Sequence, residues 1–269
     1  MSKNRIITLL TDFGLSDVYV GVMKGTIAQI NPQLKVIDIT HQIPSQNIAA
    51  ARFCLMTAFA YFPPETVHVA VVDPGVGSKR RPVAIKCANC WLVGPDNGLF
   101  SGVLSRESAI ASVELTNPKY WRSPQPSSTF HGRDIFAAAG AHLANGVALE
   151  DLGEAIDPAS LVQLEIPNCA VTATGIEGCI QYVDRFGNLI TNIPNNCIIG
   201  NNWSLTISNS SDAIRIPSGK TYSDSEPGDL IAITGSDGWV EIAVNGGSAQ
   251  SVLKLECGAI VQLLFDTNN

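Results

Sequence analysis

The first 160 residues alternate short runs of β-branched residues with longer segments of helical periodicity, and this alternation constrains the fold more than any other feature. Strands that alternate with helices build sheets with covered faces, and the buried strands of such sheets are nearly continuous apolar runs. The sequence therefore predicts an α/β domain with a mainly parallel sheet over residues 1–160. The expected strands lie at 5–10, 34–40, 67–73, 82–86 and 91–93, and the expected helices at 17–30, 47–62 and 133–144.

The pattern changes after residue 160. Residues 161–170 fall within DPASLVQLEIPN (157–168) and its continuation, where two prolines indicate a connector between domains. From residue 171 to 269 the chain consists of short alternating apolar runs separated by Gly, Asn and Ser. Short strands at this spacing are typical of a small all-β barrel or sandwich, so we expect a barrel-like second domain.

Charge and composition narrow the classes of partner. The formal net charge is −7, the isoelectric point is near 5.0, and only 15% of the residues are charged. Phosphate backbones and anionic membranes are bound by clustered Lys and Arg, so neither is an expected partner. No segment approaches the roughly 18 consecutive apolar residues that cross a bilayer. A small molecule is the better prediction.

The cysteines and the N-terminal segment indicate a cytoplasmic protein. Seven cysteines, an odd number, are scattered through the chain, which argues against a secreted disulfide framework. Asp12 ends the first apolar run too early for a secretory signal. Cys87 and Cys90 have the spacing of a zinc knuckle, but no second such pair follows, so a hairpin turn is favoured over a metal site.

Two carboxylates follow expected strands directly. Asp12, in TDFG, stands at the carboxyl end of the first strand, where open α/β sheets place ligands. A carboxylate there can accept hydrogen bonds from two neighbouring hydroxyls, as in a ribose 2′,3′-diol. Asp12 or Asp17 could equally cap the next helix. Asp73 ends the third strand and precedes a tight turn that carries Arg80, so an ion pair that only stabilises the turn is the alternative there.

His131 is the histidine with the strongest functional signal. It lies in STFHGRD, just before an expected helix. The positive end of a helix dipole disfavours the imidazolium, which leaves a neutral ring able to accept or relay a proton. The other three histidines, His41, His68 and His142, are interpreted as structural.

Two polar turns stand out in the second half. In DRFGN (184–188), Phe186 could stack on an adenine, Asn188 could hydrogen-bond its edge, and Asp184 could hold an ammonium group. Ser236 opens a second turn, SDGW. Most hairpins with such turns bind nothing, so a purely architectural role stays open for both.

Taken together, these motifs resemble those of the S-adenosyl-L-methionine (SAM) hydroxide adenosyltransferase family, which is related to the fluorinases and chlorinases. The resemblance spans nearly the whole chain with the order of motifs intact. It rests on six segments: TDFG at 11–14, VVDPGVGSKRRP at 71–82, GPDNGLF at 94–100, STFHGRDIFA at 128–137, DRFGNLITNI at 184–193 and GSDGWVEIAVNGGSA at 235–249.

The resemblance implies a fold, an assembly and a reaction. It implies an α/β domain followed by a β-barrel, and a homotrimer whose active sites lie between one subunit's first domain and its neighbour's second domain. The implied reaction converts SAM and water to adenosine and methionine, without a metal or a further cofactor. Asp73, Arg80 and His131 match the family's water-handling triad, and Asp12 the ribose carboxylate. The remaining matches are Phe186 and Asn188 at the adenine, and Asp184, Ser236 and Asp17 at the methionine end.

Departures from the halogenase pattern favour water as the nucleophile. Fluorinases carry Tyr where Asp73 stands and Ser where Gly132 stands, whereas chlorinases share the glycine. A carboxylate beside the nucleophile would repel a halide and accept a hydrogen bond from water. Three alternatives remain: a halide-dependent 5′-halo-5′-deoxyadenosine synthase, a metal-dependent phosphohydrolase that uses Asp12, Asp73 and His131 as ligands, and a non-catalytic module that binds adenosine or SAM.

Overall fold

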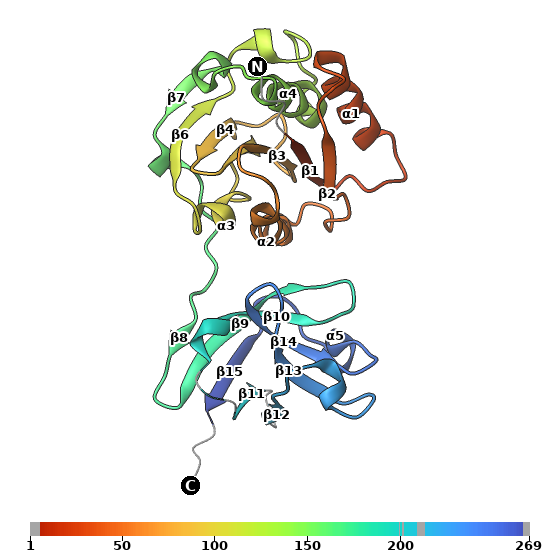
Figure 1. The fold of residues 1–269 in the computed structure, drawn as a ribbon, viewed down its shortest axis with the longest axis vertical. Coiled ribbons are helices and arrows are strands. Elements are labelled where there is room, and N and C mark those ends of the chain that lie inside the picture. Colours follow the sequence, from red (N-terminus) through yellow and green to blue (C-terminus); the bar gives the residue numbers. More distant parts are fainter. Residues whose placement is uncertain (1–5, 199, 201, 209–212, 266–269) are drawn as a thin grey trace. The chain divides into compact units, whose positions relative to one another are not determined.

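The computed structural model describes residues 6–198, 200, 202–208 and 213–265 (Figure 1). Arg5, the first residue of the first expected strand, lies outside the described residues. The chain divides into two compact units, Met1–Leu164 and Glu165–Asn269, which we call the N-unit and the C-unit.

The N-unit contains a seven-stranded sheet with the order β2-β1-β3-β5-β4-β6-β7. The four strands β2, β1, β3 and β5 are parallel to one another, whereas β4, β6 and β7 are joined by antiparallel pairing. The prediction of a mainly parallel sheet is therefore wrong, because only half of the sheet is parallel. The strands are β1 (Ile7–Thr11), β2 (Val36–Thr40), β3 (Thr66–Val71), β4 (Pro82–Cys87), β5 (Cys90–Pro95), β6 (Ala109–Glu114) and β7 (Glu154–Ile156).

The hairpin between β4 and β5 explains the mixed sheet. Only Ala88 and Asn89 separate the two strands, and parallel neighbours need a crossover of a dozen or more residues. β4 must therefore run against β5, and β6 and β7 extend the antiparallel half from it. Cys87 and Cys90 are both buried at the ends of this hairpin.

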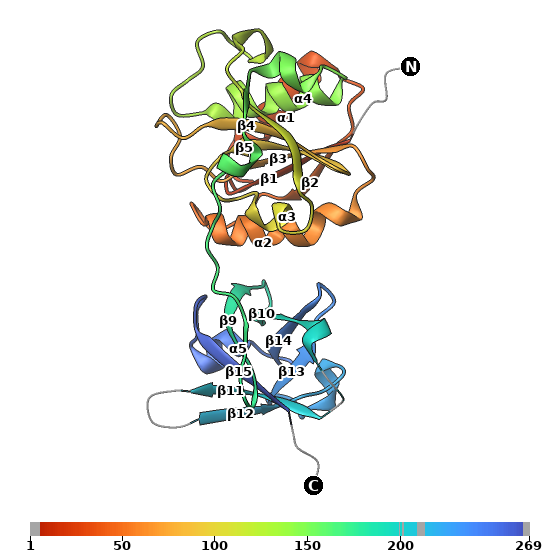
Figure 2. The same ribbon diagram turned by 90° about the vertical axis from the view of Figure 1, so that its left-hand side faces the viewer.

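Helices cover both faces of this sheet. In Figure 2, α1 and α4 lie on one side of the sheet, and α2 and α3 lie on the other. The core between the sheet and the layer of α1 and α4 contains Ile7, Leu9, Met23, Val69 and Phe136. The helices are α1 (Tyr19–Ile30), α2 (Ile48–Ala58), α3 (Ser101–Leu104) and α4 (Ala138–Ala144), with a π-helical segment at Gly132–Ala137 and 3₁₀ turns at Phe59–Tyr61, Pro118–Tyr120, Leu149–Leu152 and Pro158–Ser160.

The C-unit is an antiparallel, nearly closed, barrel-like sheet, which confirms the barrel-like prediction. Its strand order is β12-β11-β15-β9-β10-β14-β13, with β8 paired to β9, and a bridge between Ser218 and Ala232 links the two ends. Its strands are β8 (Ala170–Val171), β9 (Gly175–Val183), β10 (Leu189–Pro194), β11 (Trp203–Ser208), β12 (Ala213–Pro217), β13 (Leu230–Thr234), β14 (Trp239–Val244) and β15 (Ile260–Phe265); α5 is Ala249–Leu253, and 3₁₀ turns lie at Asn195–Cys197 and Tyr222–Asp224.

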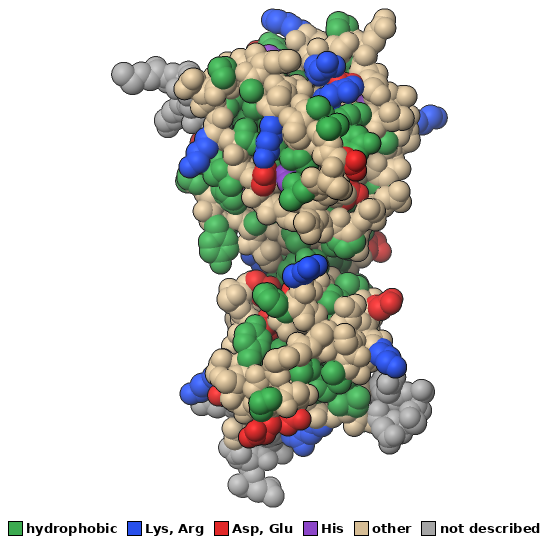
Figure 3. All heavy atoms as spheres, turned by 90° about the vertical axis from the view of Figure 1, so that its right-hand side faces the viewer, with side chains coloured by type: hydrophobic (Ala, Val, Ile, Leu, Met, Phe, Trp, Pro, Cys, Tyr) green, Lys and Arg blue, Asp and Glu red, His purple; other side chains and the backbone are tan. Residues whose placement is uncertain are grey.

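The surface carries no continuous basic area on the face drawn in Figure 3, where the described Lys and Arg side chains stand among acidic, apolar and uncharged ones. This distribution agrees with the net charge of −7. Within the described part of the chain, no helix has both the length and the apolar character needed to span a membrane.

Candidate functional site

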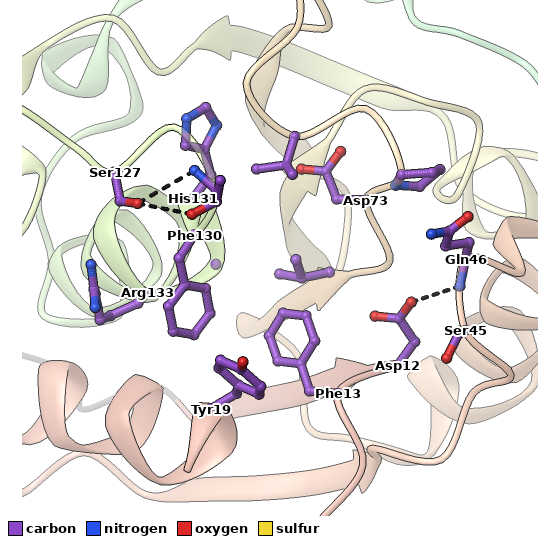
Figure 4. Close-up of a pocket in the computed structure, with 15 residues that line it drawn as sticks. Asp12, Phe13, Tyr19, Ser45, Gln46, Asp73, Ser127, Phe130, His131 and Arg133 are labelled. Carbon is purple, nitrogen blue, oxygen red and sulfur yellow. Dashed lines mark hydrogen bonds between the residues drawn. The ribbon is translucent and has the colours of Figure 1, made fainter. Parts of the chain in front are cut away.

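A cavity of about 660 Å³ opens in the N-unit at the carboxyl ends of β1 and β3. The two strands are parallel neighbours in register, with Thr11 opposite Val71. Asp12 and Asp73, which follow these strands, are thereby brought to the same edge of the sheet, where α/β folds bind ligands. The lining residues are Asp12, Phe13, Tyr19, Ser45, Gln46, Val71, Asp73, Pro74, Val76, Ser127, Thr129, Phe130, His131, Gly132 and Arg133 (Figure 4).

Asp73 and Arg80 form a buried ion pair at this cavity. The Arg80 Nε donates to both carboxylate oxygens of Asp73, at 2.9 and 3.0 Å, and Nη2 donates to Oδ2. Their side chains are only 6% and 9% exposed. A buried charge-assisted fork of this kind is screened by solvent less than a surface pair is, and its two-point geometry holds the side chains in place. The turn that contains the pair thus presents a fixed carboxylate.

His131 joins the pair through Arg80, whose Nη2 lies 2.8 Å from His131 Nδ1. A guanidinium has only donors, so Nδ1 must be the acceptor, and a neutral ring then carries its proton on Nε2. Burial lowers the pKa of His131, and the positive charge of Arg80 lowers it further, although Asp73 and Asp134 act in the opposite direction. The geometry and the pKa agree on a neutral imidazole.

The helix after His131 begins with a π-helical segment, Gly132–Ala137, which the sequence did not predict. π-Helical turns inside helices occur frequently at functional sites. Asp134, 2% exposed, anchors this turn by accepting from Ser127 N at 2.9 Å and from Arg133 Nε at 2.7 Å. Burial alone would raise the pKa of Asp134, but these bonds outweigh it and lower the pKa.

Three aromatic rings form an apolar wall of the cavity. The ring centroid of Phe13 lies 6.0 Å from that of Tyr19 and 5.7 Å from that of Phe130, and all three rings pack edge to face. They lie together below Asp73 and His131 in Figure 4. Arg133 places its guanidinium 5.0 Å from the Phe130 centroid. Phe13 and Phe130 stand in the TDFG and STFHGRD motifs, but nothing in the sequence pattern indicated a role for their rings, and nothing distinguished Tyr19 from the other apolar residues of its expected helix.

Asp12 lines the cavity, whereas Asp17 does not. The Oδ2 of Asp12 accepts from Gln46 N at 2.7 Å (Figure 4). The helix-cap alternative for the two residues is wrong, because Val18 is the N-cap of α1 and no side chain caps it. Asp17 is exposed and outside the cavity lining.

The C-unit contains a second cavity, of about 680 Å³, which brings together two residues of the DRFGN turn. Phe186 is 76% exposed there. Asp184 holds the turn by accepting from Phe186 N at 2.8 Å and from Asn188 N at 2.9 Å. Ser236 is exposed and outside the lining. The cavity is lined by Phe186, Asn188, Tyr222, Val244, Gly246, Gly247 and Ser248.

Two polar lining residues of this second cavity, Asn188 and Tyr222, are each held by a hydrogen bond. Asn188 Nδ2 donates to Asp184 Oδ2 at 2.9 Å, which fixes the amide with its oxygen available as an acceptor. Tyr222 donates its hydroxyl to Glu241 Oε1 at 2.6 Å. Glu241 is buried, and burial raises its pKa. The sequence gave no signal for Tyr222, because the segment around it has no recognisable motif.

Known proteins match this chain over both of its units. A Salinispora tropica protein named (R)-S-adenosyl-L-methionine hydrolase is 39% identical over 259 residues, which cover 96% of this chain and 97% of that protein. A Nocardia brasiliensis protein named fluorinase is 25% identical, with 97% of each chain covered. The crystal structure of an uncharacterized conserved protein from Thermotoga maritima aligns with a TM-score of 0.88 and 35% identity over 96% of this chain and 99% of that one.

Family models account for most of the chain. The SAM hydroxide adenosyltransferase N-terminal domain matches residues 7–153, which include the Asp73, Arg80 and His131 cluster. The C-terminal domain of the same family matches residues 178–262, which include the DRFGN turn. The chain therefore belongs to the SAM hydroxide adenosyltransferase family.

Proposed function

We propose that this protein hydrolyses SAM to adenosine and L-methionine. Water forms a bond to carbon 5′ as the bond from that carbon to the sulfonium sulfur breaks in line with it. The sulfur leaves as a neutral thioether, so the leaving group needs no proton. The observation that carries the proposal is the buried Asp73, Arg80 and His131 cluster at the cavity in a member of this family.

The hydrogen bonds of the cluster favour Asp73 as the acceptor of the water proton. Arg80 donates to His131 Nδ1, so the neutral ring already carries a proton on Nε2 and is a donor at that atom. Arg80 occupies both lone-pair sites of Asp73 Oδ2 and one of Oδ1, so Oδ1 keeps a lone pair for the water. Bulk water has a pKa of about 15.7, but an attacking water becomes acidic as its oxygen bonds to carbon. A carboxylate is then a sufficient base, and the proton passes from Asp73 to solvent.

Placement of the water should matter more than proton transfer. A positioned base contributes roughly 10²- to 10⁴-fold, whereas holding reactants in a near-attack geometry can contribute about 7–11 kcal/mol. The rigid fork between Arg80 and Asp73 is suited to that task because it fixes the carboxylate without help from the ligand.

The same carboxylate argues against a halide as nucleophile. A buried negative charge repels an incoming anion and accepts a hydrogen bond from water. Gly132 does not decide the matter, but it leaves little room, because a Cβ there would lie 3.2 Å from Phe13 Cζ and 3.3 Å from Phe130 Cε2.

A metal-dependent phosphohydrolase is less well supported. Its ligands would be Asp12, Asp73 and His131, but the guanidinium of Arg80 bridges Asp73 and His131 and already supplies a positive charge there. Among the residues that the structure describes, no group of three His, Cys, Asp or Glu could hold a metal ion.

We assign the substrate contacts by position. Asp12 would hold the ribose diol, Phe186 would stack on the adenine, and the Asn188 oxygen would accept from its amino group. Asp184, Ser236 and Asp17 would hold the methionine end. Asp184 already accepts two backbone hydrogen bonds within the turn, and the other two residues are exposed. The ribose and adenine contacts are therefore better supported than the methionine contacts.

We further propose a homotrimer in which the N-unit of one subunit and the C-unit of its neighbour build each active site. The support is that the proposed contacts divide between two cavities in different units. The test mixes two impaired variants, Asp73→Asn and Phe186→Ala, after partial dissociation and reassociation, and assays the mixture at a SAM concentration well below KM, where both variants are slow. Recovery of activity in the mixture is expected, because some sites then combine two intact halves. A monomeric mass by light scattering, or no recovery, would overturn this assembly.

The reaction itself is tested with SAM in ¹⁸O-labelled water, with and without chloride. We expect heavy oxygen on carbon 5′ of adenosine and an equal yield of methionine in both conditions. A chlorinated nucleoside would favour the halide-dependent synthase, and binding without any product would favour the non-catalytic module.

A further inference from the structure

A line of polar groups runs behind the TDFG segment, away from the cavity. Phe13 N donates to Thr11 Oγ1 at 3.2 Å, and Thr11 Oγ1 lies 2.8 Å from His41 Nδ1. On the other side of the ring, His41 Nε2 lies 3.1 Å from Asp38 Oδ1, and Lys24 Nζ donates to Asp38 Oδ2 at 2.6 Å. The side chains of four residues, Thr11, His41, Asp38 and Lys24, are thereby connected to the backbone of Phe13, next to Asp12.

The groups at the two ends of this line indicate where its protons lie. Asp38 Oδ1 approaches His41 Nε2 to 3.1 Å without the geometry of a hydrogen bond, and because a carboxylate carries no proton of its own, it favours the proton of a neutral His41 on Nε2. Nδ1 is then bare and accepts from the Thr11 hydroxyl, while the Thr11 oxygen accepts from Phe13 N. A hydroxyl can donate once and accept at the same time, so Thr11 satisfies both neighbours.

Burial makes this arrangement costly to disturb. Thr11 is 0% exposed and His41 is 3% exposed, whereas Asp38 and Lys24 lie at the surface and are 36% and 40% exposed. A buried donor or acceptor that loses its partner costs about 1–3 kcal/mol. The Phe13 amide therefore has one strongly preferred position.

A second bond ties the same segment to His41. Gly14 N donates to the carbonyl oxygen of His41 at 2.8 Å, so residue 41 holds two consecutive amides, one through its backbone and the other through its side chain and Thr11. Gly14 has a φ of +68°, a backbone conformation that residues other than glycine rarely adopt. Asp12, one residue before Phe13, has little freedom to move.

We propose that Thr11 and His41 are positioning residues that set the Asp12 carboxylate and the Phe13 ring for the nucleoside. This inference rests on the proposed function only for the identity of the ligand. Neither side chain lines the cavity, so their effect passes through the backbone of residues 12–14.

The same strand provides a matched control. Thr8, three residues earlier on β1, makes an equivalent buried bond to His68, with Thr8 Oγ1 2.7 Å from His68 Nδ1. Thr8 is 1% exposed and His68 is 1% exposed, but neither lines the cavity or contacts the TDFG segment through a hydrogen bond given by the structure. The Thr8–His68 and Thr11–His41 pairs have the same chemistry and similar burial, but only the Thr11–His41 pair is bonded to the TDFG segment.

The experiment compares Thr11→Val with Thr8→Val, each an isosteric loss of a hydroxyl. Both should lower the melting temperature. Only Thr11→Val should weaken adenosine binding measured by calorimetry, by about 5- to 30-fold, the factor that corresponds to one or two kcal/mol, with KM for SAM rising more than kcat falls. Thr11→Ser keeps the hydroxyl and should bind adenosine like the wild type. His41→Asn should retain much of the wild-type affinity, because Asn Oδ1 can accept from Thr11, whereas His41→Leu should lose it.

A readout without any ligand separates this inference from the proposed function. Hydrogen exchange of the Phe13 and Gly14 amides should accelerate at least tenfold in His41→Leu relative to His68→Leu. Equal effects of the Thr11 and Thr8 variants on binding, or unchanged exchange at residues 13 and 14, would overturn the positioning role. Wild-type protein that neither binds adenosine nor hydrolyses SAM would instead overturn the proposed function and leave the exchange result standing.

Discussion

The two cavities differ in how their polar groups are satisfied. In the N-unit, Asp73 and His131 are both bound to Arg80 before any ligand arrives, and the carboxylate is 6% exposed. In the C-unit, the lining side chain of Phe186 is 76% exposed and stands on a turn held by Asp184. A preorganised charge costs no reorganisation during a reaction, whereas an exposed ring gains most of its burial only on binding. This difference supports the proposal that the reaction takes place at the first cavity and that the second binds the adenine.

The sharpest way to break this comparison is to neutralise Asp73. Asp73→Asn keeps the shape of the side chain but removes the charge that pairs with Arg80 and that, in the proposed mechanism, receives the water proton. We expect kcat for SAM to fall by roughly 10²- to 10⁴-fold, with adenosine affinity nearly unchanged. Single-turnover product analysis and calorimetry on the same sample measure the two effects.

A matched control for that variant lies in the same unit. Asp96 forms a comparable buried pair with Arg81, whose Nε donates to Asp96 Oδ2 at 2.9 Å, but Asp96 does not line the cavity. Asp96→Asn should lower the melting temperature and leave turnover close to wild type. Wild-type turnover in Asp73→Asn would remove the carboxylate from the mechanism.

A second variant tests whether the first cavity also recognises the nucleoside. Asp12→Ala should weaken adenosine binding by about 100-fold, because two hydrogen bonds from a diol to a charged group are lost. Asp12→Asn keeps an acceptor for Gln46 N and should lose less. If both variants bind adenosine like the wild type, Asp12 serves the loop and not the ligand.

Part of this arrangement could be predicted from local sequence. The β-branched runs indicated most strands of the N-unit, and the change of pattern after residue 170 indicated the barrel. The pairing of β6 and β7 could not be predicted, because strand order depends on contacts distant in sequence. The π-helical turn at Gly132–Ala137 depends on the buried Asp134 and its partners rather than on helix propensity.

The candidate site shows the same limit. Asp73 and Arg80 are seven residues apart in one turn, so their pairing could be expected from spacing. The bond from Arg80 to His131 joins residues 51 positions apart, and only the resemblance to a family suggested it. Ser236 stands in a matching motif and Asp17 lies three residues after one, but both are exposed, since a motif specifies residue type and not the direction of a side chain.

Recognition in the C-unit is tested at Phe186. Phe186→Ala should raise KM for SAM by about tenfold, with a smaller change in kcat, because a stacking surface is lost while the charged cluster of the N-unit stays intact. Phe186→Trp should retain most of the affinity. A fall in kcat as large as that of Asp73→Asn would contradict the division between recognition and chemistry.

A last difference, in stability and not in activity, is how the two units respond to acid. All four histidines lie in the N-unit, and burial lowers the pKa of His68 to about 4 from an ordinary value of 6.5. The unfolded chain therefore binds a proton in this range before the folded N-unit does. Stability of the N-unit should fall as the pH drops from 6.5 toward 4, by about 2 kcal/mol between pH 7.5 and pH 5.

Glu241 should give the C-unit the opposite slope. Burial raises its pKa above the ordinary value of 4.5, although the bond from Tyr222 opposes the shift, so the folded unit binds a proton more readily than the unfolded one. Its contribution to stability is present at low pH and is lost as the pH rises through the folded pKa.

Hydrogen exchange on the intact chain at pH 7.5 and pH 5, corrected for the intrinsic rate, should show faster opening of β1 and β3 in acid but not of β10 and β14. Replacing His68 by Leu together with Thr8 by Val removes the buried ring and its partner, and should flatten the N-unit slope while the C-unit slope stays unchanged. Parallel slopes in both units would mean that other groups dominate the response to acid.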